Sequence, residues 1–310
     1  MRITDTTFRD GQQARPPYTV KQVAKMFDFL HRMGGKTGLI TASEFFLYSA
    51  KDRKCIDVCR ARGYRFPRVT SWIRANKEDL KLARDMEFDE TGMLTSVSDY
   101  HIYLKLGKTR QQAMDMYLDL ARQALEWGII PRCHFEDVTR ADIYGFCLPF
   151  AQKLMELSQQ SGMPVKIRLC DTMGYGIPYT EAALPRSVAG IIYGLQQYSD
   201  VPSECLEWHG HNDFYKAVVN ASTAWLYGAC AVNPYLAHST IAELVEDGLL
   251  NKDYYAAVED YDHAILQGIV KIASKMGIST IQSYQGSQIF EAIGISQEVI
   301  DAYFTGTVSR

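Results

Sequence analysis

The 310-residue sequence predicts an α/β protein built on a (β/α)8 TIM barrel with a helical C-terminal extension. Three observations lead to this prediction. Short β-like runs alternate with longer helical patterns, eight such runs occur, and no glycine-rich phosphate turn follows the first run, as an open doubly wound sheet would require. The strands are expected at residues 2–6, 38–45, 68–73, 91–96, 129–135, 165–170, 205–208 and 229–233.

Helical patterns lie between successive strands and complete the repeated units. They are expected at residues 19–33, 51–62, 77–86, 109–127, 140–161, 181–198 and 215–227. Residues 236–249 can supply the eighth helix, and residues 254–276 form a longer helical pattern that ends at Gly277. We therefore predict a barrel over residues 1–250 and a helical segment over residues 251–310.

Composition narrows the class of protein. The net charge of −3 comes from well-mixed charges without a basic stripe, so we expect no nucleic-acid partner. The seven cysteines are scattered in apolar runs, which is typical of reduced core thiols. Cys55 and Cys59 lack a second close pair, so a structural zinc site is not expected. Without an apolar signal core or an apolar run of about 18 residues, we expect a cytoplasmic protein without membrane contact.

Two histidines mark a candidate metal site. His209 and His211 follow the run 205–208 at alternate positions, so on a strand both rings would face one side. Asp10, which follows the first strand, offers a carboxylate at the same end of the barrel. Imidazoles and a carboxylate are common ligands of divalent cations.

Other polar residues follow the strands, and their roles stay open at this point. Arg9 could form a salt bridge with Asp10 or neutralise an oxyanion on a bound substrate. Glu136 could act as a general acid or base, or simply pair with Arg140. His101, after the fourth strand, could be a hydrogen-bonded rim residue or a catalyst.

The segment 169–176 ends the sixth strand with two glycines that let the backbone approach a ligand. The alternative is a tight turn capped by Asp171 or Thr172. The segments 44–46, 72–74 and 98–101 are rich in aromatic and polar groups, which loop packing alone would also produce.

Together these stretches resemble the DRE-TIM metallolyases, which include isopropylmalate, citramalate and homocitrate synthases, HMG-CoA lyase and the carboxyltransferase domain of pyruvate carboxylase. The resemblance covers about residues 1–233. It rests on Asp-Thr-Thr-Phe-Arg-Asp-Gly-Gln-Gln at 5–13, Glu-Asp-x-Thr-Arg at 136–140, Asp-Thr-x-Gly at 171–174 and His-x-His-Asn-Asp at 209–213.

Nine residues are expected to have a role, and the resemblance implies the roles of six of them, Asp10, His209, His211, Arg9, Glu136 and Thr172. The expected ligands of a divalent cation (Mg²⁺, Mn²⁺ or Zn²⁺) are Asp10, His209 and His211. The expected catalytic residues are Arg9, Glu136 and His101. The expected substrate-binding residues are Gln13, Thr172 and Arg140.

The implied chemistry makes or breaks a carbon–carbon bond beside a carbonyl. A 2-oxo acid would be the small-molecule substrate, and acetyl-CoA is the candidate acyl donor for a Claisen-type condensation, so the chain would be an acyltransferase or lyase. Biotin-dependent carboxyl transfer is less favoured, because the sequence shows no biotinyl carrier domain. A homodimer is a further expectation.

The family pattern breaks after the eighth strand. A loop resembling Gly-Glu-Arg-x-Gly-Asn, whose Asn completes the metal shell in several members, is replaced by Asn-Pro-Tyr-Leu-Ala-His at 233–238. Residues 228–310 instead resemble the end of the central domain of glutamate synthase, through the stretches 231–237, 274–284, 288–294 and 303–307. They include none of that enzyme's flavin residues, so no flavin is expected.

We therefore interpret the chain as a chimera joined near residues 227–233. The exchanged loop leaves open whether the activity is impaired. The alternative function is a non-catalytic barrel module or a fragment related to glutamate synthase.

Overall fold

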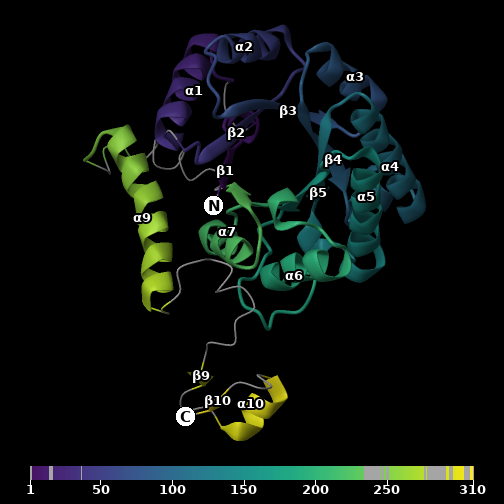
Figure 1. Ribbon diagram of the computed structural model, residues 1–310, viewed down its shortest axis with the longest axis vertical. Helices are drawn as coiled ribbons and strands as arrows, with labels where there is room; N and C mark the ends of the chain where they lie inside the picture. The colour runs from purple at the N-terminus through teal and green to yellow at the C-terminus, as the bar shows by residue number, and fades with distance from the viewer. Residues whose placement is uncertain are drawn as a thin grey trace. The chain divides into compact units, whose positions relative to one another are not determined.

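A computed structural model gives the architecture and describes residues 2–13, 17–35, 37–233, 245, 248, 251–275, 277, 291–292, 296–303 and 308–309. Eight parallel strands close into a barrel in chain order, and Figure 1 shows helices around them. The predicted fold class is confirmed. The strands are β1 (Arg2–Asp5), β2 (Ile40–Phe45), β3 (Arg68–Arg74), β4 (Glu90–Ser96), β5 (Ile130–Glu136), β6 (Lys166–Asp171), β7 (Leu206–Gly210) and β8 (Ala231–Asn233).

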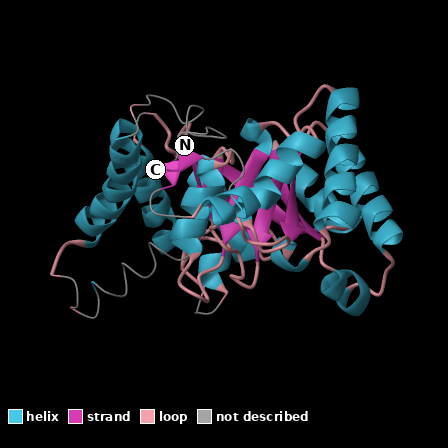
Figure 2. Ribbon diagram, turned by 90° about the horizontal axis from the view of Figure 1, so that it is seen from below, coloured by secondary structure: helices cyan, strands magenta, loops and turns pink. Residues whose placement is uncertain are grey.

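Pairing between the first and last strands closes the barrel. Arg2 is in register with Ala231, and Ile3 with Val232. On its other side, Ala231 is in register with Glu207 of β7. Because all eight strands run in the same direction, their C-terminal ends open on one side, and Figure 2 shows the strands enclosed by helices.

Seven helices follow the first seven strands, and most begin at a side-chain cap. Thr19, Ser49 and Thr109 each form a capping box, which satisfies backbone N–H groups that the first turn leaves unpaired. The helices are α1 (Val20–Gly34), α2 (Ala50–Arg60), α3 (Lys77–Asp85), α4 (Arg110–Glu126), α5 (Leu148–Ser161), α6 (Val188–Tyr198) and α7 (Ala217–Leu226).

The prediction of a helix from residue 140 was wrong at its start, because α5 begins at Leu148. Val138–Arg140 form a 3-10 turn, and Ile143–Cys147 form a π-helical turn. The carboxylate of Asp142 accepts a hydrogen bond of 2.8 Å from the backbone N–H of Gly145 and so favours a separate turn there.

The prediction of a helix from residue 181 was also wrong at its start. Ile177 donates a backbone hydrogen bond to Arg186 and accepts one from Val188, so the intervening chain forms a loop. Ser187 then caps α6 by accepting a hydrogen bond of 2.9 Å from the N–H of Gly190. A further π-helical turn, Tyr100–Lys105, follows β4.

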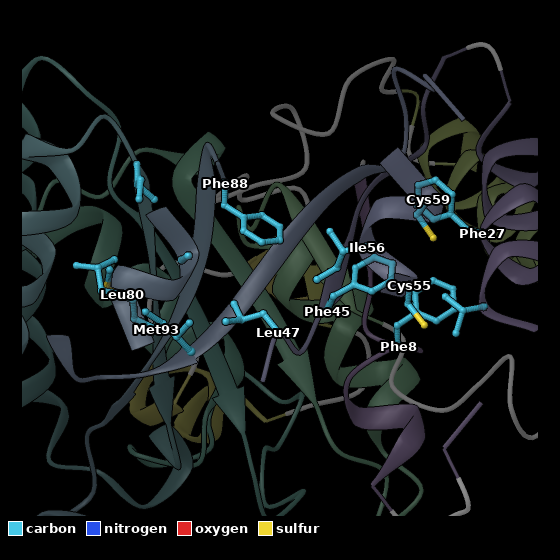
Figure 3. Close-up of a cluster of buried hydrophobic side chains, with 14 of the residues drawn as sticks. Phe8, Phe27, Phe45, Leu47, Cys55, Ile56, Cys59, Leu80, Phe88 and Met93 are labelled. Atoms are coloured by element: carbon cyan, nitrogen blue, oxygen red, sulfur yellow. The ribbon is translucent and has the colours of Figure 1, made fainter. Parts of the chain in front are cut away.

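A hydrophobic core fills the space between the first four strands and their helices. Figure 3 shows Phe8, Phe45 and Ile56 gathered in this cluster. The rings of Phe8 and Phe45 stack with their centroids 4.7 Å apart, which fixes the backbone just before Arg9. The seven cysteines are free thiols, as the scattered pattern predicted.

The chain divides into two compact units, Met1–Tyr254 and Tyr255–Arg310. The second contains most of α9 (Tyr254–Lys275), α10 (Gln297–Tyr303) and a parallel pair of short strands, β9 (Glu291–Ala292) and β10 (Val308–Ser309). The helix predicted at 236–249 lies almost wholly outside the described residues. In the part of the chain that the structure describes, no helix has the length and apolar character needed to cross a membrane.

Replacing Phe45 by Ala should lower the free energy of unfolding by about 3–5 kcal/mol, because Phe45 is 2% exposed and its loss leaves a cavity beside Phe8. Urea unfolding followed by circular dichroism would measure the change. Tyr144→Ala, at a side chain that is 65% exposed, is the control and should change stability by less than about 0.5 kcal/mol. Equal effects of the two substitutions would contradict the packing described here.

Candidate active site

The candidate site lies at the C-terminal ends of the barrel strands. His209 is in β7, and Glu136 and Asp171 are the last residues of β5 and β6. Asp10 lies in a 3-10 turn, Asp10–Gln12, shortly after β1. These positions bring polar side chains from distant parts of the sequence to one end of the barrel.

The three expected metal ligands lie together. His209 Nε2 is 3.6 Å from Asp10 Oδ2 and 3.1 Å from His211 Nε2. The two imidazole rings meet edge to face with their centroids 5.1 Å apart. The alternate spacing of His209, in β7, and His211, just after it, thus brings the rings to one place, as the sequence predicts.

Burial sets the charge of these groups. It lowers the pKa of His209 well below its ordinary value, and the neighbouring His211 acts in the same direction. Burial also lowers the pKa of His211, although Asp10 opposes the change. Both imidazoles are therefore neutral near pH 7, which is the form that donates a lone pair to a metal ion.

The donor set fits a divalent cation in its chemistry and in two of its distances. Ligand atoms about 2.1 Å from one ion, at angles of about 90–120°, lie about 3.0–3.6 Å apart, which matches the separations of 3.1 and 3.6 Å. Still, among the residues whose placement is described, no group of three His, Cys, Asp or Glu side chains is placed so that it could hold a metal ion. The three side chains supply suitable ligands but do not form a closed metal site.

Arg9 is held between two carboxylates. Its Nη2 atom lies 2.7 Å from Asp10 Oδ2, and its Nε atom lies 2.6 Å from Glu44 Oε1. The angles do not meet hydrogen-bond criteria, so these contacts are ion pairs. The guanidinium also lies over the ring of Trp72, 5.3 Å from its centroid. The expected salt bridge to Asp10 is present, and it leaves the guanidinium fixed beside the candidate ligands.

Glu44 is a buried acid beside the candidate site that the sequence did not single out. It lies in β2, is 1% exposed, and has Arg132 Nη2 at 2.6 Å and Arg168 Nη1 at 3.1 Å. Burial alone would raise the pKa of Glu44, but Arg168, Arg9 and Arg132 outweigh it and lower the pKa well below the ordinary value. Glu44 is therefore a buried, permanently charged centre rather than a loop residue.

A sequence signal for this network exists in the strand alternation. Arg132, His134 and Glu136 alternate along β5, and Glu207 alternates with His209 along β7. A strand that carries His209 toward the barrel interior must carry Glu207 there too. Charged residues at every second position of a strand, on the same face as a candidate ligand, thus predict that the barrel interior contains ion pairs.

A second cluster surrounds Glu136. Its carboxylate lies 3.0 Å from His101 Nδ1, accepts hydrogen bonds of 3.0 and 3.1 Å from Lys105 Nζ, and accepts one from Ser96 Oγ. Burial would raise the pKa of Glu136, but His101, Ser96 and Lys105 lower it to about 2. Glu136 is thus ionised at neutral pH. Lys105 was not anticipated from the sequence.

The alternative pairing of Glu136 with Arg140 is wrong. Arg140 Nη2 lies 2.7 Å from Asp137 Oδ2, and Asp137 also accepts a hydrogen bond of 2.5 Å from Ser98 Oγ. Asp137 has a positive φ of 66°, which turns its side chain away from the strand direction and toward Arg140. Arg140 therefore supports the turn after β5.

The turn after β6 binds its own backbone. Asp171 accepts hydrogen bonds of 2.8 Å from the N–H groups of Tyr175 and Gly176, so the capped turn, one of the two alternatives for this segment, is present. Thr172 Oγ1 accepts a hydrogen bond of 2.9 Å from the N–H of Asp137 and joins the turns after β5 and β6. Gln13 Nε2 donates a long hydrogen bond of 3.5 Å to Asp10 Oδ1. The exchanged loop at 234–243 lies outside the described residues.

Comparison with known families divides the chain in two. The family model named HMGL-like matches residues 1–237, and the glutamate synthase central domain matches residues 215–296. Both resemblances found in the sequence, and the chimeric interpretation, are thereby supported.

Curated relatives match each part separately. Citrate (Re)-synthase of Clostridium kluyveri is 62% identical over 231 residues, which is 74% of this chain and 51% of that protein. The 2-phosphinomethylmalate synthase of Streptomyces hygroscopicus is 36% identical over 227 residues, again 51% of its length. The glutamate synthase [NADPH] large chain of Bacillus subtilis is 56% identical over 84 residues, or 27% of this chain and 6% of that one. The chain spans about half the length of the first relatives.

Solved structures agree with the fold. Hydroxymethylglutaryl-CoA lyase from Pseudomonas aeruginosa superposes with a TM-score of 0.58 and 18% identity, and the match covers 90% of this chain and 93% of that one. At this identity the likeness supports the barrel fold alone.

Glu44→Gln should lower the free energy of unfolding by about 3–5 kcal/mol, because it leaves Arg132 and Arg168 buried without their shared counter-charge. Urea unfolding would measure the loss. Asp119→Asn removes an exposed ion pair with Arg122 and should change stability by at most about 1 kcal/mol. If Glu44→Gln unfolded at the same urea concentration as the wild type, Glu44 would not be needed to stabilise the buried Arg132 and Arg168.

Proposed function

The chain belongs to the HMGL-like family through residues 1–237, and we propose that it is a divalent-metal-dependent enzyme that forms or cleaves a carbon–carbon bond of a 2-oxo acid. The observation that carries the proposal is the meeting of Asp10, His209 and His211 beside the fixed guanidinium of Arg9. A divalent cation on those three side chains would polarise the carbonyl group of the substrate.

The proposed reaction is a Claisen-type condensation with acetyl-CoA. The name of the 62% identical relative gives citrate as its product. Citrate carries a tertiary hydroxyl on the carbon that a carboxymethyl group has joined, which is the outcome expected when the enolate of an acetyl thioester attacks a four-carbon 2-oxo diacid. Water would then hydrolyse the thioester and release the free thiol of CoA. We therefore propose oxaloacetate as the 2-oxo acid.

Arg9 would stabilise the negative charge that develops on the carbonyl oxygen. Glu44 and Asp10 hold the guanidinium from two sides, so little reorganisation is needed when that charge appears. The guanidinium stays protonated at any working pH, which suits this electrostatic role.

His101 is the proposed base for the acetyl group. Glu136 lies 3.0 Å from His101 Nδ1 without forming a hydrogen bond to it, and a carboxylate at this distance would favour the tautomer with a proton on Nδ1 and a lone pair on Nε2. Glu136 itself has a pKa of about 2, so it is too acidic to remove a proton from carbon. We assign Glu136 as a positioning residue and His101 as the group that accepts the proton.

The remaining assignments are part of the same proposal. Gln13 lies next to Asp10, and its amide could contact a substrate bound there. Thr172 and Arg140 lie on the turns that border the site, where a hydroxyl and a guanidinium suit a substrate carboxylate. Thr172 already accepts a hydrogen bond from the backbone of Asp137, and Arg140 already pairs with the Asp137 carboxylate. Each would have to contact the substrate in addition to Asp137.

A second candidate function is a non-catalytic barrel module. Two observations favour it: the sequence lacks the Gly-Glu-Arg-x-Gly-Asn loop, and residues 215–296 match the central domain of glutamate synthase. Metal content and turnover separate the two functions.

The purified protein, stripped with EDTA and titrated with Mn²⁺ or Zn²⁺, should bind one equivalent. The double variant His209→Ala with His211→Ala should bind at least about tenfold more weakly, because two of three proposed ligands are absent. Isothermal titration calorimetry would measure both. His263→Ala removes an exposed histidine of α9 and is the matched control. Negligible binding by both the wild type and the double variant would refute the metal site.

With acetyl-CoA and oxaloacetate, the metal-loaded protein should release free CoA thiol, which a thiol reagent detects. His101→Ala should reduce kcat/KM by about 10²–10⁴-fold, the range for loss of a general base, while binding the metal as the wild type does. Glu136→Gln should lower kcat with a smaller change in KM, since it acts through His101. Metal binding by the wild type without thiol release would favour the module.

A further inference from the structure

A cavity of about 550 Å³ lies at the end of the barrel opposite the candidate active site. Its position follows from its lining, because Arg2, Arg68, Glu90 and Lys166 are the first residues of β1, β3, β4 and β6. Cavities of this size hold small metabolites. The proposed function uses none of these residues.

Positive charge predominates in the lining. The cavity has five cationic side chains, Arg2, Arg65, Arg68, Arg132 and Lys166, and three carboxylates, Glu90, Glu204 and Glu207. Arg2, Arg65 and Glu204 are exposed at its edge.

The two buried carboxylates are already neutralised within the protein. Glu90 lies 2.5 Å from Arg132, 2.6 Å from Arg68 and 2.7 Å from Lys166. Burial would raise the pKa of Glu90, but these cations lower it to about 2. Glu207 lies 2.8 Å from Arg168 Nε, a residue outside the lining. The charge that remains for a ligand is therefore positive.

Arg132, which lines the cavity, has one donor without a partner in the described part of the chain. It is 1% exposed, and its two Nη atoms contact Glu90 and Glu44. Its Nε atom has no hydrogen-bond partner among the described residues. A buried guanidinium N–H normally finds an acceptor, and Arg132 is one of the residues that line the cavity.

We propose that this cavity is a binding site for a small dianion, either a dicarboxylate or a phosphate. Arg2 and Arg65 attract the ligand at the edge, and Lys166, Arg68 and Arg132 supply inner donors. The site does not depend on the proposed function, because it shares no residue with the candidate active site.

Calorimetric titration of the full chain with inorganic phosphate, and separately with succinate, at constant ionic strength tests the proposal. One saturable site is expected, and the stronger probe identifies the class of ligand. The double variant Arg2→Gln with Arg65→Gln should bind about tenfold more weakly, roughly the loss of two modest charge contacts. Arg122→Gln removes an exposed arginine that is not in the lining and should bind as the wild type does.

Two further variants test the inner donors and the independence of the cavity from the candidate active site. Lys166→Gln removes an inner donor while Arg68 and Arg132 still neutralise Glu90, and it should weaken binding by a similar factor. His209→Ala with His211→Ala should leave binding unchanged, which separates the two sites. The proposal is overturned if neither probe gives saturable binding, if Arg122→Gln weakens binding as the double variant does, or if both the double variant and Lys166→Gln bind like the wild type.

Discussion

The buried carboxylate of Glu44 is the constraint on which the barrel interior depends. A charge that is 1% exposed is tolerated only when opposite charges surround it, and Arg9, Arg132 and Arg168 all lie within 3.1 Å. Those arginines in turn neutralise other carboxylates, among them Glu90 and Glu207. The interior therefore contains an ionic network where many TIM barrels pack layers of branched apolar residues.

This network connects the two ends of the barrel. From the cavity at the N-terminal ends of the strands, contacts run from Glu90 through Arg132 and Glu44 to Arg9, which ends beside Asp10. Because each member is held by more than one partner, the guanidinium of Arg9 is positioned by residues of the barrel interior. The same charges that stabilise the interior thus prepare the candidate site.

The sequence predicts the fold and the ligand candidates because both are local patterns. Alternating runs give the strands, and the alternate spacing of His209, in β7, and His211, just after it, brings their rings together. It does not predict that Glu44 meets Arg132 and Arg168, because those residues are 88 and 124 positions away and meet only after closure sets the register. The late starts of α5 and α6 have another cause. Asp142 and Ser187 bind nearby backbone N–H groups, and such side-chain caps override a periodic pattern.

The place where the two family matches overlap shows how a chimeric chain can keep its site. The overlap, residues 215–237, contains α7 and β8. To close the barrel, β8 has to pair through its backbone with both β1 and β7. Ala231 is in register with Arg2 on one side and Glu207 on the other, and Val232 is in register with Ile3. The short strand Ala231–Asn233 provides this pairing on both sides and closes the barrel. The nine residues assigned to the site all precede residue 212, and so does the ionic network that positions Arg9. A change of parentage at residues 227–233 therefore replaces the strand that completes the barrel, while all nine candidate residues belong to the part that matches the HMGL-like family.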